Sequence, residues 1–91
     1  MYKNIDTVWA NIITHQNENF FTIKGKSYTY TVKDNYLLVN NDKRRRITKG
    51  ALAKAILINN PTPSKIEAEG IWGPSYVYGI ITDNRIKNTV K

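Results

Sequence analysis

The sequence predicts a single α+β domain: a helix, a three-stranded antiparallel meander, a second helix, a long loop and a final helix. Three features indicate this class. Apolar residues near the N-terminus have helical spacing, the middle is rich in aromatic and β-branched residues, and Thr48 is placed to cap a helix. With only 91 residues, the chain has room for one small basic domain over residues 1–91, with one shared core.

The first helix is indicated by apolar residues at i, i+3 and i+4 spacing, which are Ile5, Val8, Trp9, Ile12 and Ile13. This pattern predicts a helix from residue 5 to about residue 15. The polar run 15–19 ends it.

Three strands are predicted at residues 20–23, 27–32 and 36–39, where Tyr, Phe, Val, Ile and Thr predominate. Gly25 supplies the positive φ of a tight hairpin turn between the first two. In the second strand Tyr28, Tyr30 and Val32 share one face, which we expect the helices to cover. Adjacent residues of a strand point to opposite faces, so Phe20 is expected to be the exposed member of the Phe20–Phe21 pair.

The second half is predicted to be helical around one linker. Thr48 is expected to cap a helix that runs to about Ile58. The prolines in 59–64 are expected to prevent regular structure. The last element, 71–83, has strand-like composition, but Pro74 after Gly73 favours a helix. A winged-helix-like arrangement is the alternative fold, with the hairpin tip 24–26 as its wing.

Two segments carry a family resemblance. Gly73-Pro74-Ser75-Tyr76 followed by Asp83-Asn84-Arg85-Ile86, together with residues 20–30, resembles small, functionally uncharacterised bacterial proteins. The resemblance covers less than half of the chain. It implies one compact domain and supplies no catalytic residues.

Charge is the most informative feature of the sequence. The chain carries 14 Lys and Arg against 7 Asp and Glu, a net charge of +7. Residues 24–54 account for the whole excess, since they hold nine basic residues and two acidic ones, Asp34 and Asp42. Four of the basic residues form the run 43–46, which is expected to be a loop. Such a local concentration is typical of a surface that binds a polyanion.

Phosphate is the anion that arginine side chains and helix N-termini favour, and nucleic acid is its commonest carrier. We therefore predict a nucleic-acid-binding protein, DNA more than RNA and with little sequence selectivity. The expected phosphate contacts are Lys43, Arg44, Arg45, Arg46 and Lys49, extended by Lys24, Lys26, Lys33 and Lys54. Tyr36 or Trp72 is expected to stack on a base.

Other interpretations stay open at this point. The basic run is also typical of a solvated loop without a ligand. The chain could equally be a protein-interaction module, a small accessory subunit or inhibitor that docks its basic face on an acidic partner enzyme, such as a larger DNA-processing protein. Ile, Asn and Lys, all with AT-rich codons, make up 33 of 91 residues. This composition indicates an AT-rich bacterial or phage genome, which concerns origin and not activity. The expected role is that of an accessory factor in bacterial, phage or mobile-element DNA metabolism.

No enzymatic activity, catalytic residue, cofactor or metal is predicted. The chain lacks cysteine and has one histidine, and its five glycines are scattered rather than grouped in a phosphate-binding loop. Two weaker alternatives are a metal-free ribonuclease using His15, and a Mg²⁺ site from Glu67, Glu69 and Asp83. Because no signal peptide or membrane-spanning run is evident, we expect a cytoplasmic protein with no membrane contact.

Overall fold

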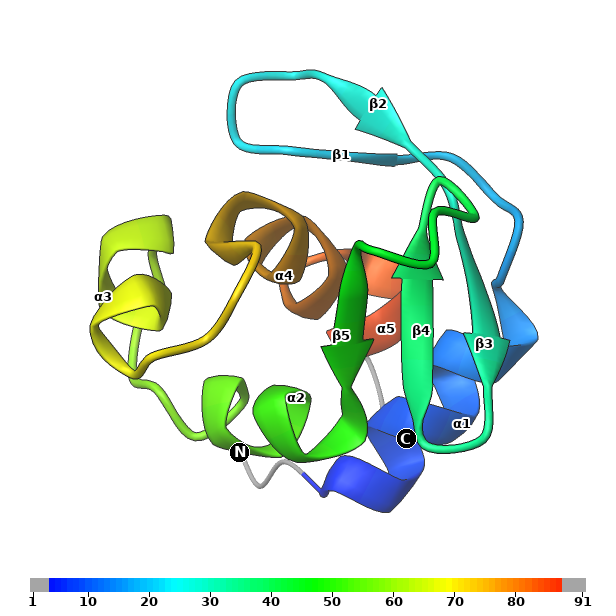
Figure 1. Ribbon diagram of the computed structural model, residues 1–91. Helices are drawn as coiled ribbons and strands as arrows, with labels where there is room; N and C mark the ends of the chain where they lie inside the picture. Colours follow the sequence, from blue (N-terminus) through cyan, green and yellow to red (C-terminus); the bar gives the residue numbers. More distant parts are fainter. Residues whose placement is uncertain (1–3, 88–91) are drawn as a thin grey trace.

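The computed structural model describes residues 4–87, so the first three and last four residues of the expected 1–91 domain lie outside the described part. An N-terminal helix, a three-stranded antiparallel sheet and then helices confirm the predicted α+β class. Figure 1 shows the elements in chain order: α1 (Ile5–Thr14), β1 (Phe20–Phe21), β2 (Ser27–Tyr28), β3 (Tyr30–Lys33), β4 (Tyr36–Val39), β5 (Arg46–Thr48), α2 (Lys49–Ala55), α3 (Pro63–Ala68), α4 (Pro74–Ile81) and α5 (Asn84–Lys87). This order agrees with the main predicted arrangement rather than with the winged-helix-like alternative.

The sheet contains only part of the predicted strands: 36–39 and the second half of 27–32 belong to it, but 20–23 does not. Its order is β3-β4-β5, whereas β1 pairs with β2 alone in a separate two-stranded sheet. The change of partner occurs at Thr29. Its N–H donates to the Asn40 side-chain oxygen at 3.2 Å, and its carbonyl accepts from the Asn40 N–H at 2.7 Å. The backbone of Thr29 therefore pairs with Asn40, just after β4, and the preceding hairpin 20–28 lies outside the three-stranded sheet.

The third strand of the sheet begins at Arg46, the last residue of the basic run 43–46, which was predicted to be a loop. Only residues 40–45 form the loop, in which Asn40 and Asn41 take positive φ values of 54° and 57°. Arg46–Thr48 then pairs with β4, because the Ile47 side chain enters the core opposite Leu37 and is 2% exposed. One apolar residue among charged neighbours is too weak a periodic signal to indicate a strand.

The helices of the second half agree with most of the predictions. Thr48 caps α2 as expected, since its Oγ1 accepts the Ala51 N–H at 3.0 Å, although α2 ends at Ala55. The segment 74–81 is helical, as favoured. The expected long loop was wrong, because it contains α3. There Thr62 is the N-cap and Pro63 occupies the first turn, where a missing N–H costs nothing.

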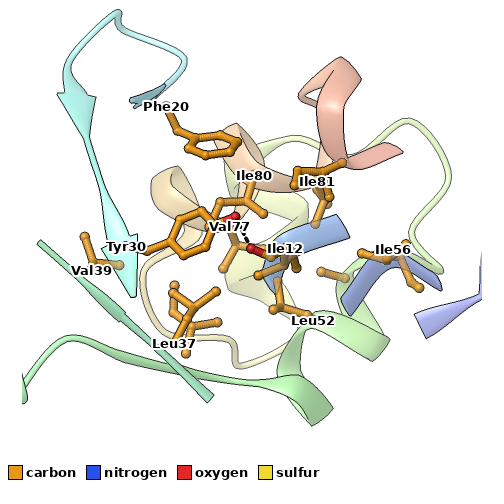
Figure 2. Close-up of a cluster of buried hydrophobic side chains, with 14 of the residues drawn as sticks. Ile12, Phe20, Tyr30, Leu37, Val39, Leu52, Ile56, Val77, Ile80 and Ile81 are labelled. Atoms are coloured by element: carbon orange, nitrogen blue, oxygen red, sulfur yellow. Dashed lines mark hydrogen bonds between the residues drawn. The ribbon is translucent and has the colours of Figure 1, made fainter. Parts of the chain in front are cut away.

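The core lies between the sheet and the helices (Figure 2). Tyr30 sits fully buried at its centre, and its hydroxyl donates to the carbonyl of Ile12 at 2.7 Å, which satisfies the C-terminal end of α1. The same burial raises the pKa of Tyr30. The other fully buried residues of this core include Ile12, Phe20, Leu37, Val39, Leu52, Val77, Ile80 and Ile86.

Phe20, predicted to be exposed, is fully buried, and Phe21 is 55% exposed instead. The Phe20 ring packs 5.1 Å from the Tyr30 ring, with the Arg85 guanidinium 4.0 Å from its centroid. These partners come from distant parts of the chain. Alternation alone therefore correctly separated the two rings but could not decide which one pointed inward.

Arg85 joins the C-terminal end of the fold to the segment after α1. Its guanidinium donates to both carboxylate oxygens of Asp83 at 2.9 Å, to Glu18 Oε1 at 2.8 Å and to the Asn19 carbonyl at 2.8 Å. His15 also bonds Glu18, at 3.1 Å. The charged residues of the segment that carries the resemblance, Asp83 and Arg85, thus have a structural role.

This cluster predicts a loss of stability in acid. Hydrogen bonds from His15 and Arg85 lower the pKa of Glu18, and a bond from Arg85 lowers that of Asp83. Such carboxyl groups stabilise the fold above their ordinary pKa of about 4, and this contribution disappears as the pH falls through the lower folded value. Urea unfolding between about pH 7 and pH 2.5 should show the loss. Arg85→Ala should make the decline shallower, and an equally steep decline in that variant would contradict the assignment.

Candidate functional site

Two clefts bring together five of the predicted site residues. The first, here called the β5 cleft, has a volume of about 460 Å³ and runs between β5, α2 and the segment before α4. Its lining includes Arg46, Lys54 and Trp72, which come from three separate parts of the sequence. Its remaining lining residues are Ile47, Thr48, Gly50, Ala51, Gly70 and Ile71.

The second cleft, here called the hairpin cleft, lies between the β1–β2 hairpin and the start of α4 and has a volume of about 430 Å³. Lys24 and Lys26 line one side of it. The other side consists of residues 73–76, and Thr22 completes the lining. No acidic residue among residues 4–87 lines either cleft, so both are electropositive.

The linings of the two clefts are adjacent at Trp72 and Gly73. Trp72 lines the β5 cleft, while Gly73 and Tyr76 line the hairpin cleft. The Trp72 side chain is 49% exposed, and its ring stacks on Tyr76 with centroids 6.1 Å apart and an interplanar angle of 29°. Gly73 has φ 68°, a left-handed conformation that glycine adopts readily and that turns the chain sharply into α4.

Tyr76 is the site residue that the sequence did not single out from the other tyrosines. Its hydroxyl accepts a hydrogen bond from Arg45 Nη1 at 2.9 Å, and its ring meets Tyr28 edge-on at 5.0 Å. The Tyr28 hydroxyl donates to the Tyr76 carbonyl at 2.7 Å. Trp72 is therefore supported by a ring that is itself held in place. The spacing from Trp72 to Tyr76 over Gly73 and Pro74 was the available signal.

The basic run 43–46 is less uniformly positive than its sequence suggests. The carboxylate of Asp42 lies 3.5 Å from the guanidinium groups of Arg44 and Arg45. The Arg44 N–H and these charges lower the pKa of Asp42, which keeps it ionised. Arg45 is also bound to Tyr76, and the Arg46 guanidinium lies 4.5 Å from the Tyr36 ring centroid. Lys43 is exposed at the loop.

The remaining predicted site residues lie away from the clefts. Lys49 forms an ion pair with Asp6 of α1 at 3.1 Å. Lys33 is exposed at the β3–β4 turn, two strands from the β5 cleft. Tyr36 lies on the outer sheet face beneath Arg46. The structure thus places Lys24, Lys26, Arg46, Lys54 and Trp72 in the linings of the two clefts and leaves the other predicted site residues outside them.

Comparisons with family models, with curated proteins and with solved structures find no match to this chain. The resemblance of residues 73–86 to small bacterial proteins therefore stays a prediction. The two clefts have to be interpreted from their own chemistry.

The two open edges of the three-stranded sheet differ. Along the outer edge of β3, backbone groups form hydrogen bonds with residues that follow α1. The Gln16 side-chain oxygen accepts the Val32 N–H at 2.9 Å, and the Asn17 N–H donates to the Tyr30 carbonyl. Along β5, the Arg45 carbonyl accepts from the Val39 N–H of β4, and the Lys49 N–H donates to the carbonyl of Asn35, just before β4. These bonds set an alternation in which the backbone of Ile47 faces β4. The backbone N–H groups of Arg46 and Thr48, two residues that line the β5 cleft, consequently point away from β4.

Over residues 4–87, no three side chains of His, Cys, Asp or Glu lie close enough together to hold a metal ion. Asp83 is occupied by Arg85. Within the same residues, no helix has the length and apolar character needed to cross a bilayer.

Proposed function

We propose that this protein binds nucleic acid through the β5 cleft and the hairpin cleft. One observation carries the proposal: half-exposed Trp72 lines one basic cleft, and its ring stacks on Tyr76, which lines the other. Arginine and lysine neutralise phosphates, and an exposed indole supplies a stacking surface for a base. We propose DNA as the ligand in preference to RNA, and the role proposed is that of an accessory factor without enzymatic activity.

The backbone contributes to the same interface. The outward N–H groups of Arg46 and Thr48 add neutral donors to the positive charge of Arg46 and Lys54. Phosphate contacts in protein–DNA complexes commonly combine basic side chains with backbone N–H groups. A cleft that offers donors and cations, and no carboxylate from residues 4–87, is suited to an anionic ligand.

Replacing one lysine in each cleft by glutamate tests this proposal. Lys26→Glu/Lys54→Glu is expected to weaken binding of a fluorescein-labelled 20-mer of DNA at least about tenfold, since two phosphate contacts become repulsive. The matched control is Lys33→Glu/Lys87→Glu, which makes the same charge change at two exposed lysines outside the clefts. Fluorescence anisotropy measures the affinity. Equal weakening by both variants would show that net charge alone attracts DNA and would contradict the assignment to the clefts.

The salt dependence of the DNA affinity gives an independent estimate of the number of phosphate contacts. Four basic side chains line the two clefts, namely Lys24, Lys26, Arg46 and Lys54. Four neutralised phosphates on a single strand correspond to a slope of log K against log salt of roughly −3. The Lys26→Glu/Lys54→Glu variant should show a shallower slope.

A second candidate is a protein-interaction module, and the exposed apolar residues of the hairpin favour it. Phe21 and Ile23 are each 55% exposed, close in sequence to Lys24 and Lys26. An apolar patch beside positive charge suits an acidic partner protein with an apolar contact. A pull-down from nuclease-treated lysate tests this candidate. Recovery of one stoichiometric acidic protein, lost in Phe21→Ser/Ile23→Ser, would support it, and equal recovery by that variant would exclude the hairpin.

A further inference from the structure

We infer that the nucleic acid bound here is an unpaired strand, with one base stacked on the exposed side of Trp72 and its neighbouring phosphates in the two clefts. This inference rests on the proposed function and specifies its ligand. It follows from the position of Trp72, from the support behind its ring and from the absence of a suitable groove-reading helix in the described residues.

The Trp72 ring is fixed from behind and open in front. Tyr76 stacks on it, Arg45 bonds the Tyr76 hydroxyl at 2.9 Å, and the Tyr28 ring packs against Tyr76. Despite this support, about half of the Trp72 side chain remains exposed, at 49%. A ring held in one orientation loses little conformational entropy when a ligand stacks on it. Most tryptophans of small domains are buried, as Trp9 is here at 6% exposure.

Stacking on such a ring requires an unpaired base. In a duplex both faces of each base are covered by the neighbouring pairs, so an indole at the surface cannot reach one without unstacking it. In a single strand the faces of the bases are accessible, and aromatic side chains are the usual stacking partners. An exposed, supported indole that lines one basic cleft and adjoins the other therefore favours a single strand.

The described helices are poorly suited to reading a duplex groove. A recognition helix places several side chains along one exposed face in the major groove. Of the helices nearest the clefts, α2 has seven residues and carries only Lys49 and Lys54 as charges, and Lys49 is paired with Asp6. Helix α4 carries no charged residue from Pro74 to Ile81.

The clefts provide places for the phosphates on both sides of the stacked base. Arg46 and Lys54 line the β5 cleft with Trp72, and Lys24 and Lys26 line the hairpin cleft with Tyr76, on which the Trp72 ring stacks. A strand that passes over the Trp72–Tyr76 pair from one cleft to the other would meet positive charge before and after it. This is the arrangement of aromatic platforms flanked by a basic track that single-strand-binding proteins use.

Intrinsic fluorescence and anisotropy test the inference with two DNA probes, unlabelled and labelled (dT)20 and a 20-base-pair duplex of mixed sequence. We expect tighter binding of (dT)20 and quenching of the emission from the exposed Trp72, with the buried Trp9 little affected. Trp72→Ala should weaken (dT)20 binding roughly 5- to 150-fold, the range for loss of one stacked base. Trp72→Phe should retain most of the affinity, because it keeps a ring at this position.

The matched control is Phe21→Ala, which removes an exposed aromatic ring that does not line either cleft. It should leave the affinity for (dT)20 unchanged. Duplex binding as tight as (dT)20 binding, unaffected by Trp72→Ala, would overturn the single-strand inference and leave the proposed function standing. Binding of neither probe, even at low salt, would overturn the proposed function itself.

Discussion

Gly79→Ala is expected to destabilise the protein by about 2–4 kcal/mol, although alanine is normally the better helix residue. A Cβ at this position of α4 would overlap the Phe21 carbonyl oxygen and would lie 2.5 Å from the Tyr28 hydroxyl oxygen. Neither group can move aside easily. The first is the backbone of β1, and the second belongs to a side chain that is 3% exposed and bonded to the Tyr76 carbonyl.

Gly50→Ala is the matched control for this substitution. Gly50 lies in the first turn of α2, and the nearest atom to an added Cβ is Thr48 Oγ1 at 3.9 Å. The same change should therefore stabilise the protein there by about 0.5–1 kcal/mol. Urea unfolding of both variants should show opposite signs. A neutral or stabilising effect of Gly79→Ala would show that α4 does not approach the hairpin as closely as described.

The second large effect is expected at Arg85, where replacement by alanine should cost about 2 kcal/mol of unfolding free energy. The guanidinium bonds two carboxylates and one carbonyl and covers the Phe20 ring. Hydrogen bonds to charged groups contribute about 1.5–3 kcal/mol each when shielded from water, and less where the side chains are partly exposed, as they are here. Arg85→Lys should recover only part of the loss, since an ammonium cannot form the forked contact.

Arg44→Ala provides the control because it has the same local sequence pattern. Arg44 follows Asp42 by two residues, as Arg85 follows Asp83, and its N–H also bonds the preceding carboxylate. The Arg44 side chain is, however, 91% exposed, and its only ion-pair partner among residues 4–87 is Asp42. Its loss should change stability by less than about 0.5 kcal/mol. Similar losses in chemical denaturation for both variants would argue against a special role of the Arg85 cluster.

The candidate site was only partly evident from the sequence. The basic window and Trp72 were visible as composition, and Lys24, Lys26, Arg46, Lys54 and Trp72 indeed line the two clefts. The sequence could not show which cations are already neutralised. Asp42, the residue just before the basic run, pairs with Arg44 and Arg45, while Asp6 of the N-terminal helix α1 pairs with Lys49. An ion pair between residues far apart in the sequence, such as Asp6 and Lys49, forms only when the chain folds.

The features that could be predicted from the sequence all depend on local interactions. The helix 5–14, the Thr48 cap and the helical segment after Pro74 each depend on spacing, capping or backbone restriction within a few residues. Such preferences act before distant parts of the chain meet, so they can be recognised in isolation. The confinement of the excess charge to residues 24–54 is likewise a property of the sequence.

The pairing of the strands, the burial of Phe20 rather than Phe21 and the lining of the clefts depend on tertiary contacts. Strand β5 forms because Ile47 packs in the core opposite Leu37. Phe20 is buried because Tyr30 and Arg85 pack against its ring. Trp72 lines the same cleft as Arg46 and Lys54 because α2, α3 and the segment before α4 bring residue 72 back to β5. Each result depends on contacts between residues distant in sequence, whose free energies no local pattern records.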